Sequence, residues 1–324
     1  MAPLRRIACG LAAALMCAAA AAQIGDYPNR PVKLITPFTA GGAIDVLCRV
    51  IGERLAQRLG QNVVVESIPG ANTIVGAQAL VRAAPDGYTF MITTMSTALN
   101  NRVLYSKLPY DPEKDLAPIT QLSYGTVLLV GPANAPYKDL QGFIDWARAQ
   151  KRPVSYGSWG IASWGHLAGE ILKREAGLEL THVPYKGEVL AVTDVRNGSL
   201  DVTFTSPISA KPLIAAGAIR AIAMTGPQRS ASMPDLPTFT EQGVRNVDLP
   251  VWVGVYAPAG TPRPILERLR SELKAVVAQP DVVEKMTAQG QTPIANTAEE
   301  FLANYRLEYP RWDALIKASG AKIE

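Results

Sequence analysis

Short apolar runs alternate with helical patterns along almost the whole chain. The runs are rich in β-branched and aromatic residues and are bounded by glycine or proline, which is typical of strands. We predict strands at residues 32–36, 62–66, 88–94, 127–131, 154–158, 180–185, 202–206, 219–225 and 251–258. Helical patterns occupy the intervals between them. This alternation predicts an α/β fold with largely parallel sheets.

Two of the helices have clear boundaries. Leucine and isoleucine recur at every fourth position between residues 45 and 59, which gives this helix one apolar face. The helix predicted at residues 163–176 is followed by Gly177, which suits a left-handed cap. The last third of the chain is helical, and its final helix opens at Thr297, where Glu300 completes a capping box. No strand is expected after residue 258.

Residues 1–22 have the three-part form of a secretory signal. Arg5 and Arg6 precede an apolar stretch that runs to residue 22, and small residues at its end provide a cleavage point before Gln23. The stretch falls short of the roughly 20 apolar residues that a membrane span needs. We therefore expect a signal peptide and a released protein in the periplasm.

The composition after this segment favours a globular chain of two domains. Cys48 is then the one cysteine left, so no internal disulfide is expected. With 48% apolar residues in the chain, the remaining roughly 300 residues can build a large core, more readily as two domains than as one. Loss of Arg5 and Arg6 lowers the formal charge from +4 to +2, which gives no sign of binding to nucleic acid or membranes.

The order of strands and helices suggests two lobes. We predict a first lobe of residues 23–124 plus 249–324 and a second lobe of residues 125–248. The chain would cross between them twice, near LSYGTVLLV and VWVGVYAP. Two crossing strands form a hinge that permits closure around a ligand. A monomer is expected.

A glycine loop between the first strand and the first helix, PFTAGGAID, is the first candidate binding element. It has neither the Lys-Ser/Thr pair of a phosphate-binding P-loop nor the G-x-G-x-x-G of a dinucleotide site. It leaves a helix N-terminus whose free N–H groups and dipole attract an anion. Asp45 either caps this helix or accepts a hydrogen bond from an amino group of the ligand.

A second loop, YGSWGIASWGH, repeats this arrangement before the helix at residues 163–176. Neither loop has Arg or Lys between its strand and its helix, so uncharged amides and hydroxyls would bind an anion without a buried countercharge. Ser96 and Ser206 follow other strands, at the ends where α/β sheets meet ligands. The predicted ligand-binding residues of these loops and strand ends are Thr39, Ala40, Gly41, Gly42, Asp45, Ser96, Ser158, Gly160, Ser163 and Ser206.

Several segments, in the same order, are similar to a known family. They include YPNRPVKLITPFTAGGAIDVL, ALVRAAPDGYTFMI, YGSWGIASWGHLAGEIL and HVPYKGEVLAVTDVRNGSLDVTF. They resemble the Bug-type substrate-binding receptors of tripartite tricarboxylate transporters. The resemblance implies a two-lobed, type II-like periplasmic binding protein that holds a small organic carboxylate between the two loops. It adds Phe38 of the first loop, and Trp159 and His166 of the second, to the predicted ligand-binding residues. It also implies delivery to a membrane permease, with no catalysis, metal or cofactor.

The chain departs from the family pattern in its second loop, where Trp159 and Trp164 replace small or polar residues. The two indoles either stack on an aromatic acid, at about 0.5 to 1.5 kcal/mol beyond burial, or pack within their own lobe. A dicarboxylic acid is the other ligand class considered.

Two other functions remain open at this stage. Ser158 and His166 could serve a periplasmic hydrolase, although G-S-W-G is not the G-x-S-x-G elbow of such enzymes. The chain could also report to a membrane kinase as a sensory subunit. His166 and Glu170 share one helical face, but two ligands without a third are weak evidence for a metal. His182 and Cys48 are expected to be packed and inert.

Overall fold

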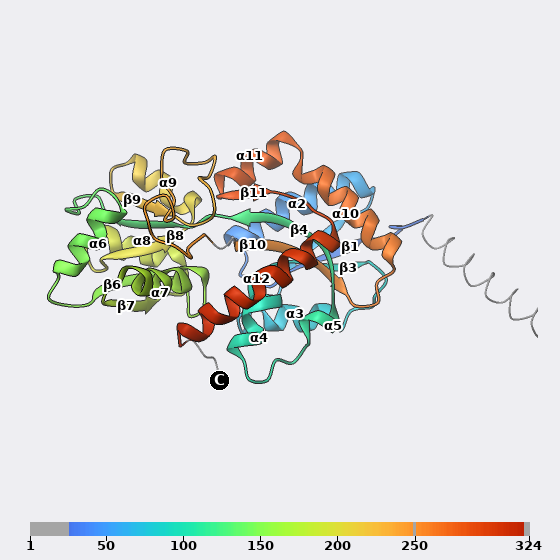
Figure 1. Cartoon of the computed structure of the whole chain (residues 1–324). Coiled ribbons are helices and arrows are strands. Elements are labelled where there is room, and N and C mark those ends of the chain that lie inside the picture. Colours follow the sequence, from blue (N-terminus) through green and yellow to red (C-terminus); the bar gives the residue numbers. More distant parts are fainter. Residues whose placement is uncertain (1–25, 249–250, 321–324) are drawn as a thin grey trace, which may run out of the picture.

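The computed structural model describes residues 26–248 and 251–320. The predicted signal peptide, residues 1–22, lies outside them. Figure 1 shows two lobes, with the red C-terminal helix α12 (Ala298–Ala318) passing across the front from one lobe to the other. In the part of the chain that the structure describes, no helix is both long and apolar enough to cross a membrane.

The first sheet has six strands in the order β11-β4-β10-β3-β1-β2. Its strands β1, β2 and β3 are parallel, and β10 runs antiparallel to both β3 and β4. The elements from the first half of the chain are β1 (Val32–Thr36), α2 (Ala43–Leu59), β2 (Val63–Ser67), α3 (Ile74–Val81), β3 (Thr89–Thr94), the π-helix η1 (Ser96–Asn100), α4 (Asn101–Leu104), α5 (Pro112–Asp115) and β4 (Leu116–Gly125). The later elements are β10 (Val251–Pro258), α10 (Arg263–Val277), α11 (Pro280–Ala288), β11 (Gln291–Pro293) and α12.

The second sheet has five strands in the order β7-β6-β8-β5-β9, in which β7, β6 and β8 are parallel. Its elements are β5 (Leu128–Pro132), α6 (Leu140–Ala149), β6 (Val154–Ser158), α7 (Trp164–Ala176), β7 (Leu180–Pro184), α8 (Glu188–Arg196), β8 (Val202–Thr205), α9 (Pro207–Ala215) and β9 (Ile219–Met224). The predicted mixture of strands and helices with parallel sheets is confirmed.

The helix boundaries follow the sequence closely. The apolar stripe of α2 is buried, and the helix ends at Gly60 with a left-handed φ of 67°. Helix α7 ends in the same way at Gly177. At the start of α12, the side chains and backbone N–H groups of Thr297 and Glu300 form the predicted capping box. Local signals were therefore sufficient at these helix ends.

Two strand predictions need correction. A strand does follow residue 258, because β11 pairs with β4 at the edge of the first sheet, although it builds no third domain. Most of β4 was not predicted, since its Thr120, Gln121 and Ser123 are polar. All three are fully buried. Their hydrogen-bond partners, such as Asn296 for the N–H group of Gln121 at 2.9 Å, come from far along the chain.

The chain passes from the first sheet to the second between Gly125 and Leu128. The return runs through residues 225–250, of which 249–250 lie outside the described residues. The segment VWVGVYAP therefore belongs to the first sheet as β10, instead of crossing itself. The exact lobe boundaries, residues 23–124 plus 249–324 and residues 125–248, stay a prediction.

Candidate functional site

The register of the strands places both glycine loops at the crossing between the sheets. Because β10 is antiparallel to β3 and to β4, the carboxyl ends of β3 and β4 lie at one edge of the first sheet. Gly125 ends β4 at that edge, and the chain enters β5 at Leu128, which pairs with Thr205 at the carboxyl end of β8. The carboxyl ends of the parallel strands in both sheets therefore lie beside the crossing, where α/β sheets bind ligands.

One hydrogen bond joins the two sides directly. The Nδ2 atom of Asn100, at the end of η1, donates to the backbone oxygen of Ala162 in the second loop at 3.4 Å. Asn100 is only 2% exposed, and its Oδ1 atom has no hydrogen-bond partner. Buried amide oxygens without a partner are uncommon in folded proteins. π-Helices such as η1 are also frequent at functional sites.

The first loop presents bare backbone. Thr39, Ala40, Gly41 and Gly42 are exposed, and Phe38 is half-buried beside them. Gly41 has a φ of 81°, a value that favours glycine. Gly42 is the N-cap of α2 and offers no side-chain acceptor, so no capping side chain bonds the first N–H groups of this helix.

Asp45 holds this loop together. Its side chain is fully buried and accepts hydrogen bonds from the backbone N–H of Gly41 at 2.9 Å, from the Ser67 hydroxyl at 2.6 Å and from both Nε and Nη2 of Arg49. Burial alone would raise the pKa of Asp45, but the bonds from Arg49, Ser67 and Gly41 hold that pKa below its usual value. These four donors occupy both carboxylate oxygens, which favours a loop-positioning role over recognition of a ligand amine.

The second loop follows β6 and ends at α7. Ser158 is buried at the end of the strand, whereas Trp159, Gly160 and Ser163 are half-buried. Gly160 has a φ of 140° and Ala162 a φ of 58°, so the loop contains one left-handed residue that is not glycine. Such strain concentrates at ligand-binding loops. Ser163 caps α7 by accepting from the backbone N–H of His166 at 3.3 Å.

The structure pairs Ser158 with His182, and not with His166. The Ser158 Oγ atom lies 2.7 Å from Nε2 of His182. His166 instead accepts the backbone N–H of Ala162 at its Nδ1 atom, at 3.0 Å. The Ser158–His166 pair considered for a hydrolase is therefore wrong, because neither ring nitrogen of His166 is bonded to the serine.

The two tryptophans have different surroundings. Trp164 is 4% exposed, packs against Trp312 of α12, and donates its indole N–H to the Thr225 hydroxyl at 3.1 Å. Trp159 is half-buried and packs against the core, with its ring beside Gly165 of α7. Stacking of an aromatic ligand, if it occurs, would therefore involve Trp159 alone.

Ser96 and Ser206 lie at the expected strand ends. Ser96 is half-buried at the start of η1. The backbone N–H and the hydroxyl of Ser206 both donate to the Glu188 carboxylate at 2.7 Å, and Ser209 donates to the same group at 2.8 Å. The N-terminus of α9 is thus filled by an acid of the chain itself, and a ligand contact with Ser206 would require that acid to move.

Apolar side chains are exposed around the same edges. Six large ones lie in the first turn of a helix that follows a parallel strand, or in the loop just before it. They are Val46, Val75, Ile161, Val189, Leu190 and Ile208, with exposed fractions of 39, 42, 50, 67, 57 and 43%. We call them the apolar rim. Because the rim is drawn from both sheets, it would line opposite sides of a ligand at the crossing.

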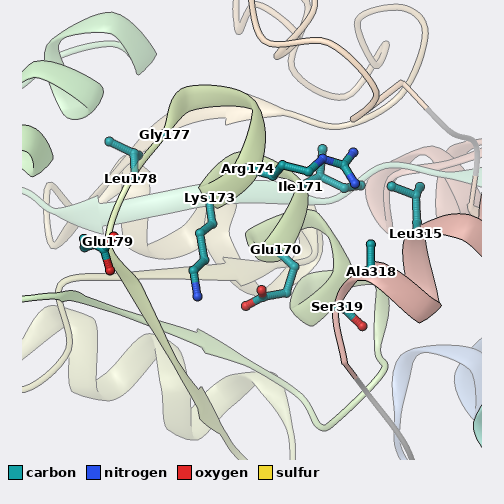
Figure 2. Close-up of a pocket in the computed structure, with 10 residues that line it drawn as sticks. All are labelled: Glu170, Ile171, Lys173, Arg174, Gly177, Leu178, Glu179, Leu315, Ala318 and Ser319. Atoms are coloured by element: carbon teal, nitrogen blue, oxygen red, sulfur yellow. The ribbon is translucent and has the colours of Figure 1, made fainter.

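A separate hollow of about 470 Å³ lies elsewhere on the molecule. Figure 2 shows it between α7 and the end of α12, where Glu170 and Lys173 lie opposite Leu315 and Ala318. Gly177, Leu178 and Glu179 also line it, and these residues precede β7. The hollow is therefore at the amino edge of the second sheet, opposite to the glycine loops.

Three residues near the glycine loops and strand ends were not predicted as site residues from the sequence. His182 lies in the middle of β7 and Glu188 at the start of α8, where no motif marks them, and Asn100 lies in a segment that was not predicted to be helical. Glu170, considered as a metal ligand, accepts the Tyr156 hydroxyl at 2.7 Å. Among residues 26–248 and 251–320, no three His, Cys, Asp or Glu side chains are grouped as they would be around a metal. The one described cysteine, Cys48, is buried, and burial raises the pKa of its thiol to about 12.

Comparison with known proteins agrees with this architecture. The family model of the tripartite tricarboxylate transporter family receptor matches residues 47–321. A UPF0065 protein of the tcbD-tcbE intergenic region of Pseudomonas sp. (strain P51) is 34% identical over 96% of this chain and 93% of its own length. The structure of the periplasmic binding protein BugD is 30% identical, with a TM-score of 0.79 over 92% of this chain and all of its own.

A third similar protein was solved with a ligand. Rpa4515 of R. palustris with adipate is 32% identical, with a TM-score of 0.82 over 91% of this chain and 99% of its own. These likenesses confirm the two-lobed periplasmic binding protein fold that the sequence predicted. The extent of the matches shows that the chain belongs to the tripartite tricarboxylate transporter receptor family, as a Bug-type member.

Proposed function

We propose that this chain captures a small organic carboxylate between its two glycine loops in the periplasm and presents it to a membrane permease. The observation that carries the proposal is the uncapped start of α2 at the crossing between the sheets. Main-chain N–H groups at a helix start bind anions. Charge-assisted hydrogen bonds are worth about 1.5 to 3 kcal/mol each, so three or four approach the roughly 8 kcal/mol of a micromolar ligand.

The surroundings favour a carboxylate with a hydrocarbon body. The guanidinium of Arg49, which follows the first loop in α2, is already paired with Asp45. The apolar rim would pack against the carbon chain of a ligand, so that both apolar surfaces would be buried from water. Burial of apolar surface is worth about 25 cal/mol per Å². A linear dicarboxylate such as adipate, the ligand in the similar structure of Rpa4515, fits both features.

Capture without conversion distinguishes this role from catalysis. Mass spectrometry of the purified protein after denaturation would identify an acid that stays bound, and calorimetry would measure its affinity. We expect adipate to bind with one site per chain and to be recovered unchanged. Recovery of a chemically altered acid would overturn the receptor assignment.

Two glycine variants provide a matched test of the site. Gly41 and Gly217 both have a left-handed φ, 81° and 65°, and a Cβ atom at either position would meet nothing within 4 Å. Alanine at each position should therefore cost a similar strain of about 1 kcal/mol. Gly41→Ala should weaken adipate binding about tenfold, whereas Gly217→Ala, in the turn between α9 and β9, should not. Equal affinities would exclude the first loop as the site.

A further inference from the structure

Two imidazole rings lie stacked beneath the second loop. The rings of His166, in the first turn of α7, and His182, in β7, have centroids 4.0 Å apart and an interplanar angle of 24°. These are the two histidines of the whole chain. Each contacts one end of the loop, since His182 faces Ser158 where β6 ends and His166 faces Ala162 before α7 begins.

The contact of His166 requires one tautomer. The backbone N–H of Ala162 is a donor, so Nδ1 of His166 must present a lone pair, and the ring proton must lie on Nε2. Ala162 is the left-handed, non-glycine residue of this loop, with a φ of 58°. The lone pair of His166 therefore stabilises the part of the loop that carries backbone strain, and whose carbonyl accepts from Asn100 across the crossing at 3.4 Å.

The contact of His182 extends to the glycine of the loop. Its Nε2 atom and the Ser158 hydroxyl form a hydrogen bond of 2.7 Å. The same hydroxyl lies 3.0 Å from the Gly160 oxygen and 3.3 Å from its N–H group. Replacement of His182 would therefore change the hydrogen bonds of the Ser158 hydroxyl, and through them those of Gly160.

We propose that the stacked pair His166 and His182 positions the second loop for ligand binding, and that it does so only while His166 is neutral with its proton on Nε2. This inference rests on the proposed function. A proton on Nδ1 would place two N–H groups against each other at Ala162, so the loop would have to leave its present shape. Acidification would then weaken binding of the carboxylate.

Few ionisable groups surround the two stacked histidines. Glu170 of α7 and Tyr156 of β6 are the neighbouring ionisable groups, and they are bonded to each other at 2.7 Å. The Tyr156 ring also lies beside the His182 ring, with centroids 5.0 Å apart. The Tyr156 hydroxyl donates to the backbone oxygen of His166 at 3.2 Å. Glu170 is the single negative charge among them, and it favours a charged His166.

Burial opposes that charge. It lowers the pKa of His166 below the ordinary 6.5, against the smaller raising effect of Glu170. Burial, followed by the nearness of His166, lowers the pKa of His182 to about 4. Both rings are therefore neutral at pH 7. Because the pKa of each ring is depressed in the folded protein, their contribution to loop stability is complete above about pH 6.5 and is lost as the pH falls toward the depressed values.

Nuclear magnetic resonance tests the tautomer without any ligand. A protein produced without a histidine tag contains two imidazoles, or one after either is replaced, so long-range ¹H–¹⁵N spectra can be assigned directly. At pH 7 we expect the ring whose signals disappear in His166→Asn to have a protonated Nε2 and an unprotonated Nδ1. A protonated Nδ1 on His166 would overturn the proposal whether or not any carboxylate binds.

Binding of adipate tests the positioning role. His166→Leu should weaken binding at pH 7 at least tenfold, while His166→Asn, whose side-chain oxygen can take the place of Nδ1, should restore most of it. His182→Gln should likewise restore what His182→Leu loses. As the pH falls from 7 toward 4, the wild type should lose more affinity than His166→Asn, and the ratio of the two affinities cancels the titration of adipate itself. Equal binding by wild type and His166→Leu would overturn the proposal, whereas absence of binding by the wild type would instead count against adipate as the ligand.

Discussion

The indole rings of Trp164 and Trp312 pack edge to face, with centroids 4.8 Å apart and an interplanar angle of 67°. Trp164 opens α7 of the second lobe, and Trp312 belongs to α12, which also packs against η1 and against β4 of the first sheet. The pair therefore ties the second glycine loop to the other half of the molecule.

Replacement of Trp312 by alanine should strongly destabilise the fold. The side chain is fully buried, and loss of a buried aromatic group costs about 3 to 5 kcal/mol. Urea unfolding followed by circular dichroism measures this change. Leu307→Ala, on the exposed face of the same helix with 77% exposure, is the matched control and should change the free energy of unfolding by less than about 0.5 kcal/mol. Similar losses in both variants would refute the role of the pair.

Asp45→Asn should weaken binding of every carboxylate to a similar degree. The substitution removes the charge that pairs with Arg49 and one acceptor of the loop, at about 1 to 3 kcal/mol. Succinate and aspartate, which differ by an amino group, separate this role from amine recognition in calorimetry. A loss confined to aspartate would show that Asp45 contacts the ligand amine.

Asp313→Asn provides a control for the Asp45 experiment. Asp313 also accepts from a cation four residues away, Lys317, but on the surface of α12. Exposed pairs contribute little to stability. We expect the melting temperature and the affinities of Asp313→Asn to match those of the wild type.

Glu308 should make the protein less stable as the pH rises from about 4.5 to 7. Its carboxyl is 9% exposed and accepts the indole N–H of Trp252 at 3.1 Å. Burial raises its pKa from 4.5 to about 7, so in this interval the folded state holds a proton that the unfolded state releases. Stability therefore falls with rising pH and levels off above 7.

Glu308→Gln should remove that dependence. The amide oxygen can still accept from Trp252 but cannot ionise. The variant should exceed the wild type in free energy of unfolding by up to about 3 kcal/mol at pH 8 and match it near pH 4. Denaturant titrations at both pH values measure the difference. A variant that is less stable at pH 8 would show that the charge is favourable in the fold.

The apolar rim should be covered when ligand binds. Val189 and Leu190 in the first turn of α8 are its most exposed members. Their joint replacement by serine should lower the affinity for adipate about three- to tenfold and make the heat-capacity change of binding less negative, because less apolar surface is buried. Leu307→Ser, at an exposed apolar position of α12 outside the rim, should leave both quantities unchanged. An unaltered heat-capacity change in the double variant would place the rim outside the binding surface.

Local sequence was enough for the elements of the fold. Every predicted strand region contains a strand, and the ends of α2, α7 and α12 follow their glycine or capping-box signals. These features depend on neighbours within a few residues, so periodicity and capping chemistry reveal them. The two glycine loops could be predicted for the same reason, since each lies between a strand and a helix start.

Contacts between distant residues were decided by the tertiary structure alone. Ser158 pairs with His182, and not with His166, which is nearer in sequence, because β6 and β7 lie side by side in the sheet. The polar residues of β4 can be buried because Asn296 and Gln291, from near the other end of the chain, form hydrogen bonds with them. Such pairings depend on which strands become neighbours, and no pattern of spacing in a single chain records that choice.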